Sequence, residues 1–274
     1  MNKWTTMKKR LILLIIFISF FFSSYAKQYK LDKNISYIEP SETNSYRKER
    51  CKLDIYYPTD KKDFPTIIWF HGGGLEGGEK DIPKELQEQG IAVVSVNYRL
   101  SPKATHPAYI EDAAEAVAWT FRHIQKYGGN THKIYLSGHS AGGYLTLMVT
   151  LDANYLAKHN INANTIKGAI PIAGQTNTHY TIRKERNIPT EIPIIDQYAP
   201  LNQARKDVPP MVLITGDRKL EMTARYEENA HLEAILKSLG AQVSLYEIKG
   251  FNHGNVVAPG CLLALEFIRK IGDL

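Results

Sequence analysis

The sequence predicts a doubly wound α/β domain built on a mostly parallel sheet. From Lys52 onward, short runs of apolar and β-branched residues alternate with segments that show helical spacing of apolar residues. The strand-like runs are almost continuously apolar, as is typical of parallel strands that helices cover on both faces. With 274 residues and no internal repeat, the chain is long enough to form one large domain with a substantial core.

The expected elements follow one another along the chain on both sides of one long insertion. In the longest helix, over residues 109–127, apolar residues recur at helical spacing, namely Ala113, Ala116, Val117, Phe121 and Ile124. The expected strands cover 53–58, 66–70, 91–98, 133–137, 166–173, 211–215 and 242–248, and the expected helices cover 82–89, 109–127, 141–152, 224–239 and 261–271.

The alternation stops at residues 174–208, which have mixed charge, several prolines and little periodicity. A loop of this length in a compact domain is usually functional or mobile. The segment forms either a short cap over the strand ends or a surface excursion with no role in a site. The sequence leaves both interpretations open.

Residues 1–26 have the three parts of a signal peptide. Four basic residues precede the apolar run 11–22, and small Ser24 and Ala26 follow it. This run has 12 residues, whereas a membrane-spanning helix needs ~20. We therefore expect cleavage after Ala26, export to the periplasm or the medium, no stable membrane anchor, and a mature domain of residues 27–274.

The charge of the mature chain does not indicate a nucleic-acid partner. Residues 1–26 carry four basic and no acidic side chains, so their removal lowers the formal net charge from +6 to +2. Cys51 and Cys261 either pair in an oxidising compartment or remain free thiols, since one precedes an early strand and the other lies near a late helix. The sequence does not choose between these two states.

The segment "GHSAG", residues 138–142, joins an expected strand to an apolar helix. In an α/β sheet this Gly-x-Ser-x-Gly turn lifts the Ser140 hydroxyl above the strand ends, because only small residues fit beside it. A serine hydroxyl becomes a nucleophile when a base takes its proton. His253 in "GFNHGN" suits that role, since it lies in a loop between the last strand and the last helix.

Five glycines follow His71 within seven positions, in the stretch "HGGGLEGG". Such a cluster marks special backbone angles or a ligand that approaches the main chain closely. Attack of a serine on an ester carbonyl places negative charge on the oxygen, which backbone N–H groups must meet. Gly72, Gly73 and Gly74 can turn their N–H groups outward with no side chain blocking the substrate, and the N–H of Ala141 supplies another donor. We expect His71 to hold the loop.

These motifs together resemble the α/β-hydrolase superfamily, within it the esterases and lipases related to hormone-sensitive lipase and the secreted carbohydrate esterases. The segments "HGGG", "NYRLSP", "GHSAGG" and "GFNHGN" occur in this order over roughly residues 50–272. The resemblance implies the α/β-hydrolase fold and hydrolysis of small-molecule or polysaccharide-borne carboxylic esters through a seryl acyl-enzyme. It also implies a catalytic triad with Ser140 as nucleophile and His253 as base, and an oxyanion hole formed by Gly73, Gly74 and Ala141.

The catalytic acid is where the sequence departs from the pattern of that superfamily. The carboxylate commonly lies two or three residues past the glycine of "MVLITG", but Arg218 and Lys219 occupy those positions. Asp217 follows the strand directly and has a short side chain, so we predict that it holds His253. Glu221 has a longer reach but starts further from the sheet, and it is the reserve candidate.

Two other functions remain open for the same motifs. A peptidase or amidase uses the same triad, although no appended domain is present in the sequence to select peptides. A catalytically inactive hydrolase fold used for binding is the other alternative, because a fold does not dictate a function.

The sequence contains no metal-ligand spacing, phosphate-binding loop or dinucleotide glycine motif, so no cofactor is expected. Arg99 and Asp112 are expected to brace the structure, as an ion pair or as a carboxylate at a helix N-terminus.

Overall fold

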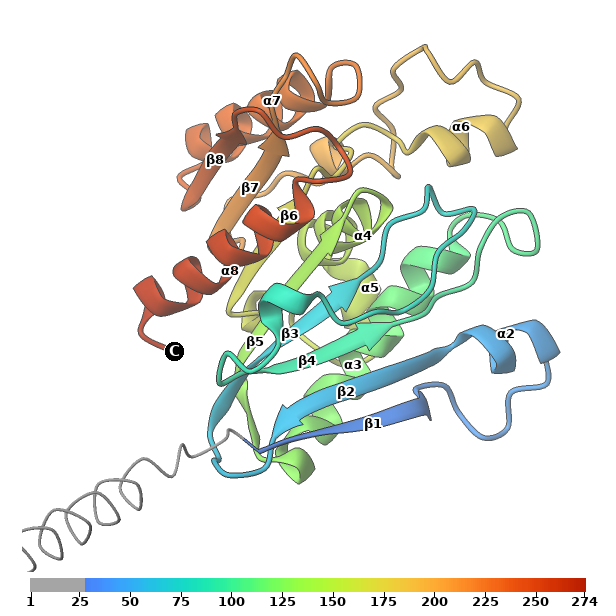
Figure 1. Ribbon diagram of the computed structural model, residues 1–274. Coiled ribbons are helices and arrows are strands. Elements are labelled where there is room, and N and C mark those ends of the chain that lie inside the picture. The colour runs from blue at the N-terminus through green and yellow to red at the C-terminus, as the bar shows by residue number, and fades with distance from the viewer. Residues whose placement is uncertain (1–27) are drawn as a thin grey trace, which may run out of the picture.

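The computed structural model describes residues 28–274, which form one eight-stranded sheet with helices on both faces (Figure 1). The predicted signal peptide lies outside the described residues. The strands lie in the order β1-β2-β4-β3-β5-β6-β7-β8. β2 pairs antiparallel with β1 and β4, and every later pairing is parallel. The strands are β1 (Tyr29–Ser36), β2 (Lys52–Pro58), β3 (Phe64–Phe70), β4 (Ala92–Val96), β5 (Gly129–His139), β6 (Gly168–Ile172), β7 (Met211–Gly216) and β8 (Val243–Ile248).

This order and pairing confirm the prediction of a doubly wound, mostly parallel sheet. The four longer helices are α3 (Ala108–Tyr127), α4 (Ala141–Leu151), α7 (Arg225–Ser238) and α8 (Val257–Ile271). The shorter ones are α2 (Ser45–Arg50), α5 (Ala153–Ala157) and α6 (Tyr180–Glu185), with 3-10 turns η1 (Lys84–Leu86), η2 (Ala163–Thr165) and η3 (Pro200–Gln203).

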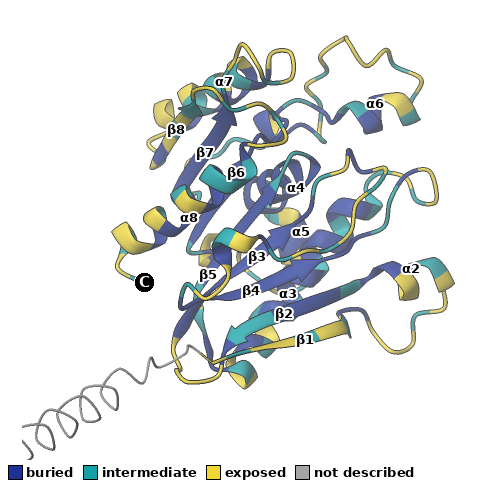
Figure 2. Ribbon diagram, viewed as in Figure 1, coloured by how far each residue is buried: buried dark blue, intermediate teal, exposed yellow. Residues whose placement is uncertain are grey.

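The central strands are buried on both faces, which explains their continuous apolar runs (Figure 2). Successive side chains of a strand point to opposite faces. In β3, Ile68 and Phe70 pack into the cluster that contains α3 and α4, while Ile67 and Trp69 pack into the cluster that contains α8. Side chains of α7, α4 and β7 form a third cluster, on the face of the sheet that α3 and α4 cover.

Two parts of the fold differ from the elements expected from the sequence. The helix expected over 82–89 is only the 3-10 turn η1, because its buried apolar residues end at Leu86 and the polar residues 87–89 provide no apolar stripe to pack a longer helix. Strand β1 and helix α2 precede the first expected strand. β1 is an edge strand with mostly exposed side chains, so its sequence carries little apolar signal.

The two cysteines are free thiols that lie in separate apolar clusters. Cys51 packs in the cluster on the α3 face of the sheet, and Cys261 packs in the cluster on the α8 face. Both are fully buried, and burial raises the pKa of the Cys51 thiol to about 12. Of the two states left open by the sequence, the structure has the unpaired one.

Residues 174–208, here called the cap segment, contact the loop of residues 71–78, here called the glycine loop. Helix α6 makes these contacts: the Thr181 hydroxyl donates a hydrogen bond to the Gly74 carbonyl, and Lys184 Nζ lies 2.6 Å from Glu76 Oε1. The cap segment thus packs beside the carboxyl end of β3 and is not a detached excursion (Figure 1).

No helix within residues 28–274 combines the length and the hydropathy needed to cross a bilayer.

Candidate active site

Ser140 lies on a tight turn between β5 and α4, with φ 55° and ψ −114°, a region that only a strongly constrained non-glycine residue adopts. The flanking glycines make this turn possible. A Cβ atom would lie 2.6 Å from the Phe70 carbonyl oxygen if added to Gly138, and 1.9 Å from it if added to Gly142. The Ser140 N–H donates to the Ile172 carbonyl at 2.8 Å, which fixes the turn at the carboxyl ends of β5 and β6.

The structure brings Ser140, His253 and Glu221 together in one hydrogen-bonded chain. His253 Nε2 lies 2.8 Å from Ser140 Oγ, and His253 Nδ1 lies 2.5 Å from Glu221 Oε1. The three residues lie in the loops that follow β5, β8 and β7, within the parallel stretch β5-β6-β7-β8 of the sheet. The Glu221 side chain is 0% exposed and that of His253 is 24% exposed, so the carboxylate is shielded while the imidazole remains accessible.

Asp217 does not contact His253, so the sequence-based choice of Asp217 over Glu221 is corrected by the geometry. Its Oδ1 accepts from the Lys219 N–H and its Oδ2 from the Gly250 N–H, both at 3.0 Å. These two N–H groups lower the pKa of Asp217 and join the loops that follow β7 and β8. The backbone turns back at this point, since the Glu221 N–H donates to the Asp217 carbonyl at 2.8 Å. The turn directs the longer Glu221 side chain at His253.

The Glu221 carboxylate is ionised in this environment. Burial would raise its pKa, but the hydrogen bond from His253 and the N–H groups of Met222 and Gly216 lower it below the usual range. Those N–H groups donate at 2.8 and 3.2 Å. A negative charge thus lies against the imidazole nitrogen that points away from Ser140.

The glycine loop lies beside Ser140 and contains backbone N–H groups that have no hydrogen-bond acceptor among residues 28–274. Gly73 and Gly74 have φ values of +112° and +67°, which side-chain-bearing residues rarely adopt. Within residues 28–274, no carbonyl or side chain accepts a hydrogen bond from the N–H of either residue. A Cβ on neighbouring Gly72 would lie 3.5 Å from Ser140 Cβ. Ala141 is the first residue of α4, so its N–H has no partner within the helix.

A family model described as BD-FAE matches residues 53–234, about two thirds of the chain. The chain belongs to the BD-FAE family. The matched region begins in β2 and extends into α7, so it contains the glycine loop, Ser140 and Glu221.

The curated relatives of this BD-FAE chain include several esterases. It is 25% identical over 227 residues to esterase LipC of Mycobacterium tuberculosis, which covers 74% of this chain and 56% of LipC. It is 24% identical over 221 residues to the kynurenine formamidase of Salmo salar, covering 75% of this chain and 71% of that protein. The chain spans between a quarter and about half of the length of the first three curated relatives.

Solved structures confirm the α/β-hydrolase fold expected from the resemblance. A truncated carbohydrate esterase from gut microbiota superposes with a TM-score of 0.73 at 19% identity, covering 90% of this chain and 98% of that one. The propionate-bound esterase 2 of Thermogutta terrifontis superposes with a TM-score of 0.67 at 20% identity, covering 92% and 97%.

Buried polar side chains hold the glycine loop of this family member in place. His71 Nδ1 donates to the Gly72 carbonyl at 2.6 Å, and the Tyr98 hydroxyl donates to the His71 carbonyl at 2.8 Å. Burial lowers the pKa of His71 to about 4, so the ring is neutral at neutral pH.

Arg99 forms a two-pronged ion pair with Asp112, at 2.7 and 2.6 Å. The bracing role expected for Arg99 and Asp112 is confirmed.

Sequence reasoning missed His139, the residue between Gly138 and Ser140. Its Nε2 donates to the His253 carbonyl at 2.7 Å, and the two imidazole rings have their centroids 4.8 Å apart. Burial lowers the pKa of His139 to about 4, so this donor is a neutral ring. The only sequence signal was its place in the Gly-x-Ser-x-Gly turn, which does not say what the side chain contacts.

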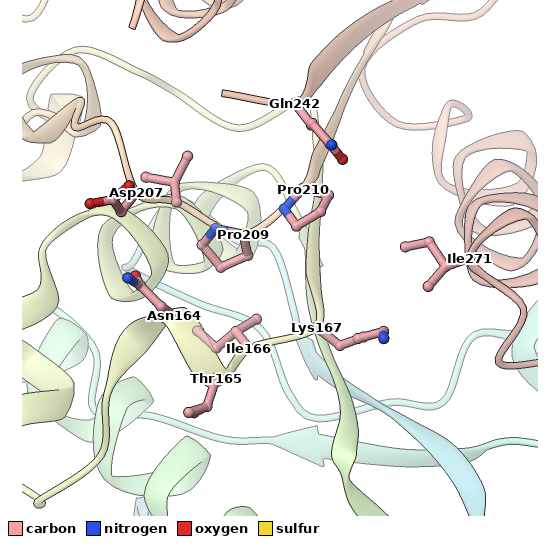
Figure 3. Close-up of a pocket in the computed structure, with 10 residues that line it drawn as sticks. Asn164, Thr165, Ile166, Lys167, Asp207, Pro209, Pro210, Gln242 and Ile271 are labelled. Carbon is pink, nitrogen blue, oxygen red and sulfur yellow. The ribbon is translucent and has the colours of Figure 1, made fainter. Parts of the chain in front are cut away.

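One hollow lies next to the site. It measures about 540 Å³ and lies between the cap segment and the residues that follow Glu221, including Tyr180, Arg183, Met222 and Arg225. Another hollow, of about 570 Å³, lies at the amino ends of the parallel strands, away from the site (Figure 3). Its wall includes Lys167, Pro210 and Gln242, which directly precede β6, β7 and β8 respectively. Among residues 28–274 no cluster of His, Cys, Asp or Glu could hold a metal ion.

Proposed function

We propose that this protein is a carboxylic ester hydrolase that works through a seryl acyl-enzyme. The observation that carries the proposal is the chain from Ser140 through His253 to Glu221, with contacts of 2.8 and 2.5 Å. Such a chain of nucleophile, base and carboxylate is the arrangement that activates a serine hydroxyl. Names of curated relatives, including esterase LipC, support ester hydrolysis as the reaction.

In the first half of the proposed reaction, Ser140 Oγ forms a bond to the ester carbonyl carbon while His253 Nε2 takes its proton. Glu221 stabilises the imidazolium that results, and it keeps the Nδ1 proton in place. Negative charge develops on the carbonyl oxygen, which the N–H groups of Gly73, Gly74 and Ala141 receive. The bond to the alcohol oxygen then breaks, and His253 gives its proton to the departing alcohol.

In the second half, water attacks the acyl-enzyme and His253 takes its proton. Collapse of the second tetrahedral intermediate breaks the bond to Ser140 Oγ, which regains a proton from His253 as the carboxylic acid leaves. The ester bond is cleaved by one water molecule, and the protein returns to its starting state.

Hydrolysis of short-chain p-nitrophenyl esters tests this function. The purified mature protein should release p-nitrophenol with saturation kinetics, and Ser140→Ala should abolish the release. A fluorophosphonate probe should label Ser140, as detected by mass spectrometry of the modified peptide. Absence of both hydrolysis and labelling would favour the binding-protein alternative.

An amide is the second candidate substrate, because kynurenine formamidase is among the relatives of the chain. His253 could protonate a departing amine as it protonates an alcohol. Ester and amide versions of one acyl group, assayed side by side, distinguish the two functions, and we expect the ester to be cleaved faster.

We also propose that the protein is exported and acts on small acyl esters, free or carried on polysaccharides. Export rests on the signal-peptide pattern of residues 1–26, and the carbohydrate esterase among the structural neighbours fits a sugar-linked substrate. N-terminal sequencing of the protein recovered outside the cytoplasm should begin at Lys27. A panel of acetylated, feruloylated and alkyl esters identifies the preferred acyl and alcohol groups.

A further inference from the structure

We propose that the hollow beside the site is a subsite for a carboxylate group on the ester substrate, and that Arg183 is its anchor. This inference rests on the proposed ester hydrolase function and adds the charge of the preferred substrate. The hollow measures about 540 Å³, which is large enough for a substituted acyl or alcohol group.

The walls of the hollow connect it to the site on three sides. Tyr180 adjoins the glycine loop, since a Cβ atom on Gly74 would lie 1.9 Å from the Tyr180 hydroxyl oxygen. Met222 directly follows Glu221 and lines the opposite wall. Arg225 Nη1 donates to the Ala173 carbonyl at 2.8 Å, at the carboxyl end of β6 beside the strand that leads to Ser140. A substituent of an ester held at Ser140 would extend into this space.

Arg183 brings to the hollow a buried positive charge that has no ion pair of its own, since the nearby Glu228 carboxylate that attracts it is already paired with Arg225. Its side chain is buried, at 4% exposure, and its Nη1 donates to the carbonyl of Ile192 in the cap segment. Its Nε is buried without a hydrogen-bond partner, and no carboxylate of residues 28–274 lies within ion-pair distance of the guanidinium. Burying a guanidinium without an opposite charge costs folding free energy unless a ligand supplies that charge.

The other buried charges of the hollow are already paired. Arg225 Nε lies 3.1 Å from Glu228 Oε1, and Glu228 Oε2 accepts the Thr176 and Asn177 N–H groups at 2.9 and 3.1 Å. Glu191 also lines the hollow, but it is exposed and its charge is screened by water. Arg183 is thus the buried cation that remains to receive a ligand.

A carboxylate fits this anchor better than a neutral hydroxyl group. A guanidinium presents its N–H groups as a planar fork that matches the two oxygens of a carboxylate. A hydroxyl group would accept one hydrogen bond and leave the buried charge uncompensated. Either the acyl part or the alcohol part of the ester can carry this carboxylate, and the test covers both.

The test compares two pairs of esters that differ in one carboxylate. The first pair is the p-nitrophenyl monoester of adipate and p-nitrophenyl hexanoate. The second pair is the acetate ester of para-hydroxyphenylpropanoate and para-propylphenyl acetate. In at least one pair, the wild-type protein should show a higher kcat/KM for the acidic ester. Arg183→Met should lower the ratio of kcat/KM, acidic over neutral, by roughly tenfold or more, as expected for loss of a charge-assisted hydrogen bond.

Lys184→Met is the matched control, because it removes the same charge from the adjacent position of α6. Lys184 is exposed, pairs with Glu76 and does not line the hollow, so the ratio should stay within about threefold of wild type. Arg183→Lys keeps the charge without the fork and should give an intermediate ratio. Because Arg183 is buried, circular dichroism must show that each variant is folded.

A measurement on the wild-type protein keeps the inference testable if the Arg183 variants do not fold. Free adipate should inhibit hydrolysis of p-nitrophenyl hexanoate competitively, and uncharged hexanediol should not. The inference is overturned if neither acidic ester is preferred and adipate does not inhibit, or if folded Arg183→Met leaves the ratio unchanged. Loss of the proposed function itself looks different, since neither neutral ester would then be hydrolysed.

Discussion

Replacing Glu221 by Gln removes one charge from the site and preserves the shape of the side chain. The carboxylate lies 2.5 Å from His253 Nδ1 and is fully shielded from solvent. In the proposed reaction, that charge stabilises the imidazolium formed when Ser140 attacks. The amide of Gln can also donate a hydrogen bond to Nδ1, which would favour the tautomer with its proton on Nε2, and that tautomer cannot accept a proton from Ser140.

The expected loss follows from the separation of the two charges. Unit charges about 4 Å apart interact by about 4 kcal/mol at the effective dielectric constant of about 20 that suits partly buried groups. Each factor of ten in rate corresponds to about 1.4 kcal/mol, so Glu221→Gln should lower kcat roughly a thousandfold. Folding should persist, since Gln can still accept one of the two backbone hydrogen bonds that Glu221 receives, at a cost of about 1 kcal/mol.

Asp217→Asn provides the control, because Asp217 is a nearby carboxylate that does not contact His253 and instead accepts from the Lys219 and Gly250 N–H groups. It should lower kcat less than about tenfold. Steady-state hydrolysis of p-nitrophenyl acetate gives kcat, and thermal melts followed by circular dichroism show that both variants are folded. A thousandfold loss in folded Asp217→Asn, with near-normal activity in Glu221→Gln, would refute the assignment of Glu221.

Three further predictions concern the supports of the site. Gly78→Ala should lower kcat at least about tenfold, because Gly78 has a φ of +100° and an added Cβ would lie 2.4 Å from the Gly72 carbonyl oxygen of the glycine loop. Gly77→Ala is the control and should be tolerated, since no atom would lie closer than 3.9 Å to its Cβ. The pKa of His71 is about 4 in the folded chain, against an ordinary value of 6.5, so between these pH values the unfolded chain binds a proton that the folded chain does not. The free energy of unfolding, measured by urea titration, should therefore fall as the pH drops from 6.5 to 4. The fall should be less steep in His71→Gln, which lacks this titrating group. His139→Leu should lower kcat about tenfold with little change in KM, and His139→Gln should restore much of it, because an amide can still donate to the His253 carbonyl; equal kcat in the two variants would contradict this.

The parts of the site that the sequence predicted depend on local constraints. The turn around Ser140 needs small flanking residues, and the structure shows that added Cβ atoms at Gly138 and Gly142 would collide with the Phe70 carbonyl. That requirement leaves a readable pattern in the chain. His253 was found because it is the histidine in the loop between the last strand and the last helix.

The acid was assigned wrongly because its identity depends on how a loop folds. Both Asp217 and Glu221 follow β7, and only the turn that reverses the chain between them decides which one faces His253. The same limit applies to Arg183, which lies in a segment without periodicity. Its burial depends on packing between α6 and the rest of the cap segment, which no pattern of residue types specifies.

Helix α6 links the choice of substrate to the rate of reaction. Its Thr181 hydroxyl bonds to the Gly74 carbonyl, and its Tyr180 hydroxyl occupies the space where a side chain at position 74 would lie. A change of length or sequence in the cap segment that shifts this helix would also shift Gly74, whose own N–H, in the preceding peptide, is a proposed oxyanion donor. A different cap grafted onto this scaffold must therefore keep α6 packed against Gly74, because a cap that displaces this residue would lower kcat even if its pocket binds the substrate well.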